Sequence, residues 1–168
     1  MMKTERQKVI IFVLLGILVG MTVGYSALSS ILKIDGVSKI TGDWDIHFTT
    51  IDQGTLVDAT NVSASISNQT TATFTVNLKK PGSSAEYSVT VKNGGSYNAV
   101  VESITGVDEA NEASPTDIIF EVSDIDVGTE LEAGTEKTFK VKATWKPEST
   151  TIVDNNKQAV ISVNFVQK

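Results

Sequence analysis

The residues best suited to chemistry are few, and they do not make up a familiar catalytic set. The one histidine is His47, and on a strand it would share a solvated face with Asp45 and Thr49. A zinc protease of the usual kind needs two histidines at helical spacing with a glutamate as base, and the chain has no such pair. Cysteine is absent, which excludes thiol catalysis and cysteine metal sites. We therefore expect a protein that is not an enzyme.

One acidic cluster has the oxygen ligands that calcium prefers. Its candidate metal ligands are Asp108, Glu109, Glu112 and Asp117. Their spacing does not match an EF-hand loop and lacks the glycine of that loop. A solvated acidic loop over residues 107–117 is the alternative that we favour, although residues 109–114 could form one helical turn. Calcium is thus the only candidate cofactor.

The charge balance excludes one class of partner. The formal net charge of the 168 residues is −6, and Lys3, Glu5, Arg6 and Lys8 give the N-terminal segment +2, so the remainder carries −8. No arginine follows Arg6. Such a surface repels nucleic acid and anionic headgroups, so we expect no nucleic-acid partner.

A hydrophobic segment near the N-terminus should decide in which cellular compartment the rest of the chain lies. Residues 9–32 carry no charge and follow a basic stretch. At 1.5 Å per residue, about 20 apolar residues cross a bilayer as a helix, and positive flanks stay in the cytoplasm. The pattern predicts a signal peptide or signal-anchor helix over residues 1–28 and an exported domain over residues 29–168. Cleavage after Gly24 or Ser26 and retention as a membrane tether both remain open.

Three glycines in that segment, Gly16, Gly20 and Gly24, recur at four-residue spacing. On a helix they would form a smooth stripe where a second helix can approach closely. Ordinary leader composition explains the same spacing. Helix association in the membrane, or in the core of a pilin-like filament that keeps the helix, is the functional alternative.

The exported part alternates between apolar and polar residues. Residues 71–78 read Thr-Ala-Thr-Phe-Thr-Val-Asn-Leu, and the same period recurs over residues 43–49, 86–92, 138–145 and 161–165. Alternation with period two is typical of antiparallel strands with one buried and one solvated face. Weaker strand candidates are residues 31–40, 61–66, 97–104 and 118–122.

Turn residues separate these segments, notably Pro81-Gly82 and Asn93-Gly94-Gly95. About eight to nine short strands with frequent turns predict an all-β fold. We expect an immunoglobulin-like or jelly-roll β-sandwich, preceded by the hydrophobic N-terminal helix. Since no segment after the leader shows a convincing helical period, a single domain of sheets should form the exported part.

Two segments resemble a known group of proteins. Residues 81–99, where a strand enters an Asn-x-Gly-Ser turn and an alanine-bearing strand leaves it, and residues 131–141 are similar to small signal-bearing surface proteins of Firmicutes. The leader and its Gly24-Tyr25-Ser26-Ala27 junction fit the same group. Its best-known members are the camelysin and TasA-like biofilm-fibre proteins. The resemblance implies a sandwich on the surface of a Gram-positive cell and assembly into fibres by strand exchange.

The residues after the leader are compatible with such exchange. Residues 32–37 are short, apolar and β-prone, and Leu32, Ile34 and Val37 could be donated to a neighbour's open sheet edge. Pairing within the same domain is the alternative. We expect a non-catalytic, secreted or membrane-tethered structural subunit of a biofilm matrix that self-associates. A tethered adhesin or ligand-binding module, with contacts in the loops of residues 53–61 and 107–117, is the second hypothesis.

Overall fold

The computed structural model of the chain describes residues 42–150 and 156–168, apart from the side chain of Asn61. In that part of the chain it has nine strands and one short helix. Their bounds are β1 (Ile46–Val57), β2 (Ala59–Asn68), β3 (Thr71–Leu78), β4 (Ser84–Asn93), β5 (Ala99–Thr105), α2 (Val107–Glu112), β6 (Ile118–Ser123), β7 (Glu130–Leu131), β8 (Glu136–Trp145) and β9 (Asn156–Gln167).

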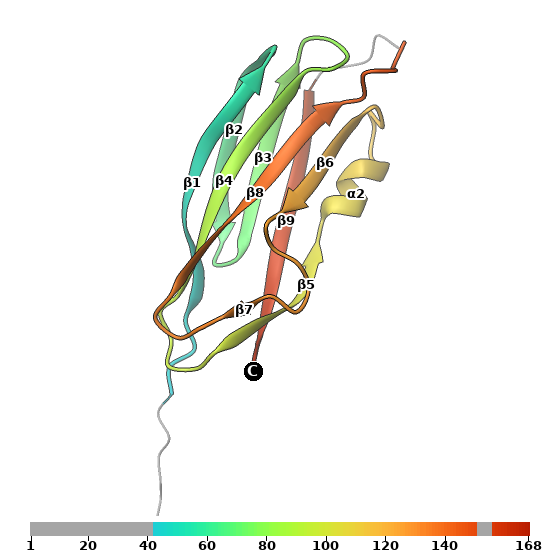
Figure 1. Cartoon of the computed structure of the whole chain (residues 1–168). Coiled ribbons are helices and arrows are strands. Elements are labelled where there is room, and N and C mark those ends of the chain that lie inside the picture. Colours follow the sequence, from blue (N-terminus) through green and yellow to red (C-terminus); the bar gives the residue numbers. More distant parts are fainter. Residues whose placement is uncertain (1–41, 151–155) are drawn as a thin grey trace, which may run out of the picture. The chain divides into compact units, whose positions relative to one another are not determined.

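The strands form two antiparallel sheets, which Figure 1 shows as two layers. The first, sheet A, has the strand order β1-β4-β8-β6, and the second, sheet B, has the order β2-β3-β9-β5-β7. Antiparallel pairing follows from the alternating pattern, because each sheet has one buried and one solvated face. The predicted all-β sandwich is therefore confirmed at the level of two packed antiparallel sheets.

The core lies between the sheets and is made by the apolar half of each alternating segment. β3 alternates between buried and half-buried side chains along its whole length, as its sequence predicts. The Phe74 and Tyr87 rings lie 5.1 Å apart across the two sheets, and Phe48 and Phe139 lie 5.7 Å apart within sheet A. The core of the described residues begins at Ile46 and continues to β9.

The loop favoured over residues 107–117 is in part a helix, close to the alternative of one helical turn over residues 109–114. Residues 107–112 form helix α2, which contacts β5, β6 and β9 and buries Ala110. The helix begins because Gly106 adopts φ 91°, and the Gly106 N–H donates to the Glu109 carboxylate at 3.0 Å. A carboxylate three residues into a helix commonly caps its start in this way. The signal was hidden because glycine stands where serine or threonine usually marks the cap.

A second predicted loop, residues 53–61, was wrong. β1 continues to Val57, and β2 begins at Ala59 after Asp58 in the left-handed conformation. A register shift between Gln53 and Leu56 lets β1 stay paired with β4 past Gly54. Bulges of this kind absorb an extra residue without ending a strand.

The predicted leader, residues 1–28, and the strand candidate over residues 31–40 lie outside the described residues, as do Gly16, Gly20, Gly24, Leu32, Ile34 and Val37. Within residues 42–150 and 156–168, no helix is long and apolar enough to cross a membrane.

Candidate strand-acceptor site

β9 is an inner strand of sheet B, but it extends beyond its neighbour β3, and its last residues have no described partner strand on that side. β3 pairs with β9 only from Asn156 to Ser162, and the Val163 N–H then donates to the Thr70 carbonyl at 3.0 Å. β5 covers the other side of β9 as far as Gln167. Because alternate residues of a strand direct their backbone groups to the same side, Phe165 and Gln167 present N–H and C=O groups to the side that no described strand occupies.

The start of β1 offers a second edge of the same kind. The Asp45 carbonyl accepts a hydrogen bond from Gly94 on the β4 side, whereas the Phe48 N–H points away and donates to Gln69 at 2.7 Å. The backbone groups of Ile46 therefore also point away from β4. Trp44, two residues earlier, is 44% exposed. β1 begins at Ile46, whereas the alternating segment begins at residue 43, so the indole of Trp44 precedes the strand and is not in the core.

A cavity of about 310 Å³ lies where these features meet. Its walls come from the start of β1, the β2–β3 turn, β5 and β9. They consist of Trp44, Ile46, Gln69, Thr70, Glu102, Asn164 and Phe165. The β5 wall is distorted, because a register shift between Val101 and Ser103 leaves Glu102 without a strand partner. We call this cavity, together with the unpaired edge of β9, the acceptor slot.

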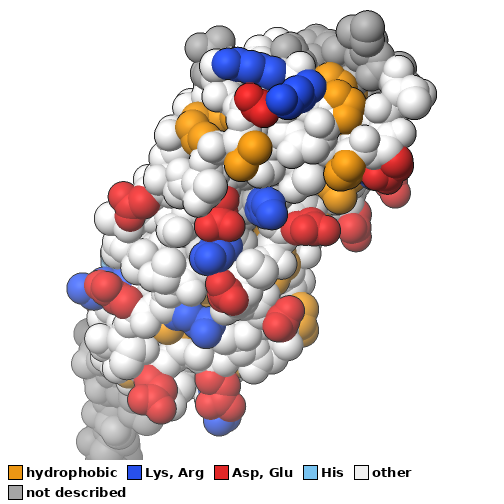
Figure 2. Space-filling view, turned by 45° about the horizontal axis from the view of Figure 1, so that its top comes forward, with side chains coloured by type: hydrophobic (Ala, Val, Ile, Leu, Met, Phe, Trp, Pro, Cys, Tyr) orange, Lys and Arg blue, Asp and Glu red, His pale blue; other side chains and the backbone are white. Residues whose placement is uncertain are grey.

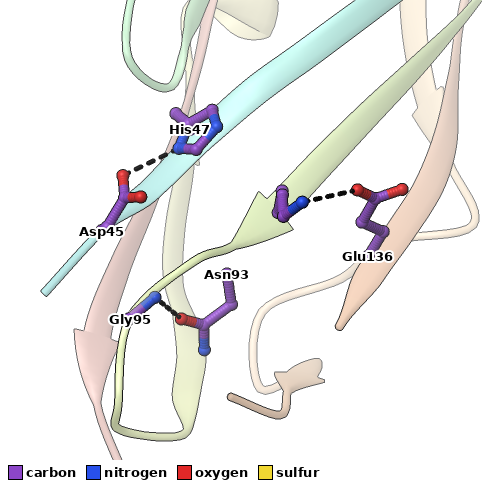
Figure 3. A network of polar contacts seen from close by, with 6 residues as sticks. Asp45, His47, Asn93, Gly95 and Glu136 are labelled. Atoms are coloured by element: carbon purple, nitrogen blue, oxygen red, sulfur yellow. Dashed lines mark hydrogen bonds and ion pairs between the residues drawn. The ribbon is translucent and has the colours of Figure 1, made fainter. Parts of the chain in front are cut away.

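A polar network holds the end of sheet A at which β1 starts (Figure 3). Asn93 is buried, and its amide donates to the carbonyls of Tyr97 at 2.9 Å and Leu131 at 3.0 Å. Its Oδ1 accepts the Gly95 N–H at 3.1 Å. Gly94 and Ser96 of the same turn hold the backbone of residues 43–45. The network therefore fixes the chain that carries Trp44, so the slot has a preformed wall.

The opposite side of the sandwich is closed to strand addition by side chains. Asn111 of α2 donates to the Phe120 carbonyl at 2.9 Å and accepts the Phe120 N–H at 2.7 Å, as a neighbouring strand would. Occupied backbone groups cannot template another strand, so the β6 edge is blocked at this position.

A buried lysine fixes the segment that follows. The Lys157 ammonium is 4% exposed and donates to the carbonyls of Ala113, Pro115 and Ile118 at 3.0, 2.7 and 2.6 Å. Burial, and to a lesser extent the charge of Lys146, lower the pKa of Lys157. The three hydrogen bonds satisfy all three donors of the ammonium, so its role here is to hold the connection from α2 to β6.

The predicted metal ligands lie on α2 and in the turn before β6. Asp108, Glu109 and Glu112 belong to the helix, and Glu109 caps its start. In the described part of the chain, no three acidic, histidine or cysteine side chains come together as a metal site. Glu109 turns back to the Gly106 N–H at the start of the helix, so one of the four predicted ligands serves as a helix cap.

His47 lies on β1, and its Nδ1 is 2.8 Å from the Asp45 carboxylate (Figure 3). Both side chains lie on the outer surface and are partly exposed. Among the described residues, Asp45 is the only side chain that hydrogen-bonds the ring. Sequence reasoning placed His47 correctly but missed the slot, whose residues come from four segments far apart in the chain.

Comparison with protein-family models, with curated proteins and with solved structures gives no match. The candidate site therefore rests on its geometry alone.

Proposed function

We propose that this protein is a non-catalytic structural subunit of the cell surface that assembles by accepting a strand from a neighbouring copy. The observation that carries the proposal is the unpaired edge of β9 beside the cavity with Trp44 and Phe165. An exposed sheet edge is a template for pairing with another chain, and natural proteins usually block it. Here Asn111 occupies the β6 edge at Phe120, whereas the end of β9 beyond β3 is left open within the described residues.

The slot suits a short apolar strand. Phe165 and Gln167 present their backbone groups for pairing, and the rings of Trp44 and Phe165 in the cavity offer aromatic surface for side chains of the added strand. The donor that we propose is the segment with Leu32, Ile34 and Val37. A donated strand would pair with Phe165 on one side and lie against Ile46 on the other, which joins the two sheets. Repetition of this contact from copy to copy produces a fibre, because a head-to-tail contact that does not close continues indefinitely.

Disulfide trapping tests the proposal cleanly, because the chain has no cysteine. A chain with Ile34→Cys is mixed with a chain with Trp44→Cys, and disulfide-linked heterodimers are counted on a gel after mild oxidation. We expect efficient linkage. The matched control is Val57→Cys at the other end of β1, whose side chain is 43% exposed against 44% for Trp44. Equal linkage to both positions, or linkage only within one chain that carries both Ile34→Cys and Trp44→Cys, would contradict exchange between copies.

A second function is favoured by one observation. The cavity places the exposed ring of Trp44 among polar groups of Gln69, Thr70 and Asn164. The lining is mostly polar, and a few convergent polar groups beside an aromatic ring can orient a small polar ligand. An adhesin-like domain that binds a neutral sugar would use such a site. A titration with neutral oligosaccharides would then change the Trp44 fluorescence, while a Trp44→Phe chain, which keeps the buried Trp145, would show no change.

The remaining parts of the proposal concern place and family. A secreted or membrane-tethered location in a Gram-positive biofilm matrix, the hydrophobic N-terminal helix with its Gly16, Gly20 and Gly24 stripe, and the camelysin/TasA-like resemblance all belong to it. So does the immunoglobulin-like or jelly-roll connection pattern. N-terminal sequencing of the protein from fractionated cells distinguishes a released chain from a tethered one. Recovery in the cytosol with the N-terminus intact would overturn the location.

A further inference from the structure

The outer face of sheet A and the outer face of β2, β3 and β9 in sheet B differ sharply in charge. Sheet A carries both signs on its outer face, with ion pairs between Lys140 and Glu86 at 3.5 Å and between Lys92 and Glu136 at 3.4 Å. Figure 2 shows acidic and basic side chains intermingled on the side of the molecule that it presents. In sheet B, the strands β2, β3 and β9 have 10, 8 and 12 residues and include one charged residue, Lys157, which points inward. Their outer face is therefore free of charge.

This uncharged face consists of hydroxyl and amide side chains around one aliphatic residue. Register places Ser63, Ser65 and Ser67 of β2, Thr71, Thr73, Thr75 and Asn77 of β3, and Asn156, Gln158, Val160 and Ser162 of β9 on it. Val160 is 51% exposed. We call these residues the neutral face.

The side chains of the neutral face are held in place by hydrogen bonds across the strands. Ser67 bonds Thr73 at 2.7 Å, and Thr71 bonds Ser162 at 2.8 Å. Gln158 donates to Thr75 at 3.3 Å, and Asn77 donates to Asn156 at 2.9 Å. Side chains that are already ordered lose little conformational entropy when a partner covers them, so the face is preorganised for contact.

We propose that the neutral face is a contact surface for a second copy of this chain. The described residues carry 17 acidic and 9 basic groups, so two copies repel each other over most of their surface. The neutral face is where that repulsion is smallest. Hydroxyls and amides both donate and accept hydrogen bonds, so this face is complementary to itself under a two-fold axis without any opposite charge.

The size of the face indicates when the contact forms. Three strands about 4.8 Å apart and about eight residues long cover roughly 350 Å² per copy. A stable dimer needs about 800 Å² per partner. The contact is therefore weak between free monomers and effective only between copies held at high local concentration, on a membrane or along a fibre. A neutral polysaccharide is less well suited, because no aromatic ring lies on this face to stack on sugar rings.

A single cysteine on the neutral face tests the proposal in the full-length chain as it is expressed. With Val160→Cys we expect disulfide-linked homodimers to form at least about tenfold faster than with Val127→Cys, a more exposed valine in the β6–β7 loop. Adding Thr75→Glu to the Val160→Cys chain should abolish the linkage, because two copies would then face each other with like charges. Thr138→Glu is the matched control, since Thr138 also bonds a hydroxyl across strands, that of Thr90 at 3.0 Å, but on sheet A.

Each result bears on this proposal separately from strand exchange. Linkage through Val160→Cys that survives Thr75→Glu, or that is no faster than through Val127→Cys, would overturn the neutral face as a contact between copies. The neutral face would also be refuted as a contact between copies if no homodimer forms and Thr75→Glu abolishes binding to an insoluble neutral polysaccharide. Linkage of Ile34→Cys to Trp44→Cys without linkage through Val160→Cys would support strand exchange and refute the neutral face. Linkage through Val160→Cys without linkage of Ile34→Cys to Trp44→Cys would support the neutral face and refute strand exchange.

Discussion

The side-chain amide of Asn111 forms two hydrogen bonds with the backbone of Phe120, one in each direction, at 2.9 and 2.7 Å. A residue of helix α2 thus replaces the strand that would otherwise pair with the edge of β6. The opposite situation holds at β9, where residues 164–167 have no partner strand on the β3 side within the part of the chain that the structure describes. The β6 edge of sheet A and the uncovered end of β9 in sheet B are thus unequal, and this inequality would give assembly a direction.

Removal of the Asn111 amide should weaken the domain and free the β6 edge. In Asn111→Ala, both backbone groups of Phe120 lose a half-buried partner, and we expect the free energy of unfolding to fall by about 1–3 kcal/mol. Urea unfolding followed by far-UV circular dichroism measures this loss. Glu112→Ala, at an exposed position of the same helix, is the control and should change stability by less than about 0.5 kcal/mol. Equal effects of the two changes would show that the amide does not hold the edge.

Lys157 should stabilise the folded chain through the three carbonyl groups to which its ammonium donates. In Lys157→Met, a side chain of similar length leaves the carbonyls of Ala113, Pro115 and Ile118 without their donor. We expect a loss of about 1–3 kcal/mol in the free energy of unfolding near neutral pH. Lys140→Met, at an exposed position of sheet A, should cost much less. A Lys157→Met chain more stable than the wild type would show that desolvation of the ammonium outweighs its hydrogen bonds.

The pH dependence of stability should carry the signature of Lys157. Burial and Lys146 lower the pKa of this group in the folded chain, whereas the unfolded chain keeps its proton up to the ordinary value of 10.5. Below that pH the unfolded state binds more protons, so stability rises as the pH increases toward 10.5. Urea midpoints of the wild type, measured relative to those of Lys157→Met, should therefore increase over this range. A flat difference between the two chains would contradict the lowered pKa.

Tyr87 should make stability fall, rather than rise, with increasing pH. Burial raises the pKa of Tyr87 to about 12, and its hydroxyl donates to the Thr75 carbonyl at 3.0 Å. The unfolded chain loses this proton near pH 10, so stability that is complete below pH 10 is lost as the pH rises to about 12, by on the order of 2 kcal/mol. Absorbance at the tyrosinate band should show a phase near pH 12 that Tyr87→Phe removes. Ionisation of every tyrosine in a single step near pH 10, before unfolding, would be inconsistent with burial of this ring.

Gly106 should be far less replaceable than another glycine of the same backbone conformation. Gly106 and Gly128 have φ of 91° and 89°. A Cβ at Gly106 would overlap the carbonyl oxygen of Val160, whereas a Cβ at Gly128 meets no atom within 4 Å. Gly128→Ala should therefore cost only the left-handed backbone penalty, about 1–2 kcal/mol. Gly106→Ala should cost clearly more, because backbone atoms of β9 must move. Similar thermal midpoints for the two variants would refute the close approach.

The alternating pattern of the sequence was sufficient to predict the all-β fold and, along β3, which face of the strand is buried. The period of two over residues 71–78 is a local property of the chain, since consecutive side chains of a strand point to opposite sides. The burial of Lys157 was not predicted, although this residue continues the inward series of Ala159, Ile161 and Val163. A lysine in that register is easily taken for an exposed strand end, and its three carbonyl partners lie about 40 residues away.

Only the tertiary structure decided the site and the neutral face, because both depend on which strands become neighbours. Trp44 and Phe165 line one cavity, although they lie near opposite ends of the described sequence. β9 outruns β3 because of the register at which they pair, and no local pattern encodes that offset. The absence of charge is visible in β2, β3 and β9 separately, but β9 is some 80 residues from the other two. Pairing between strands distant in the sequence turns three uncharged segments into one surface.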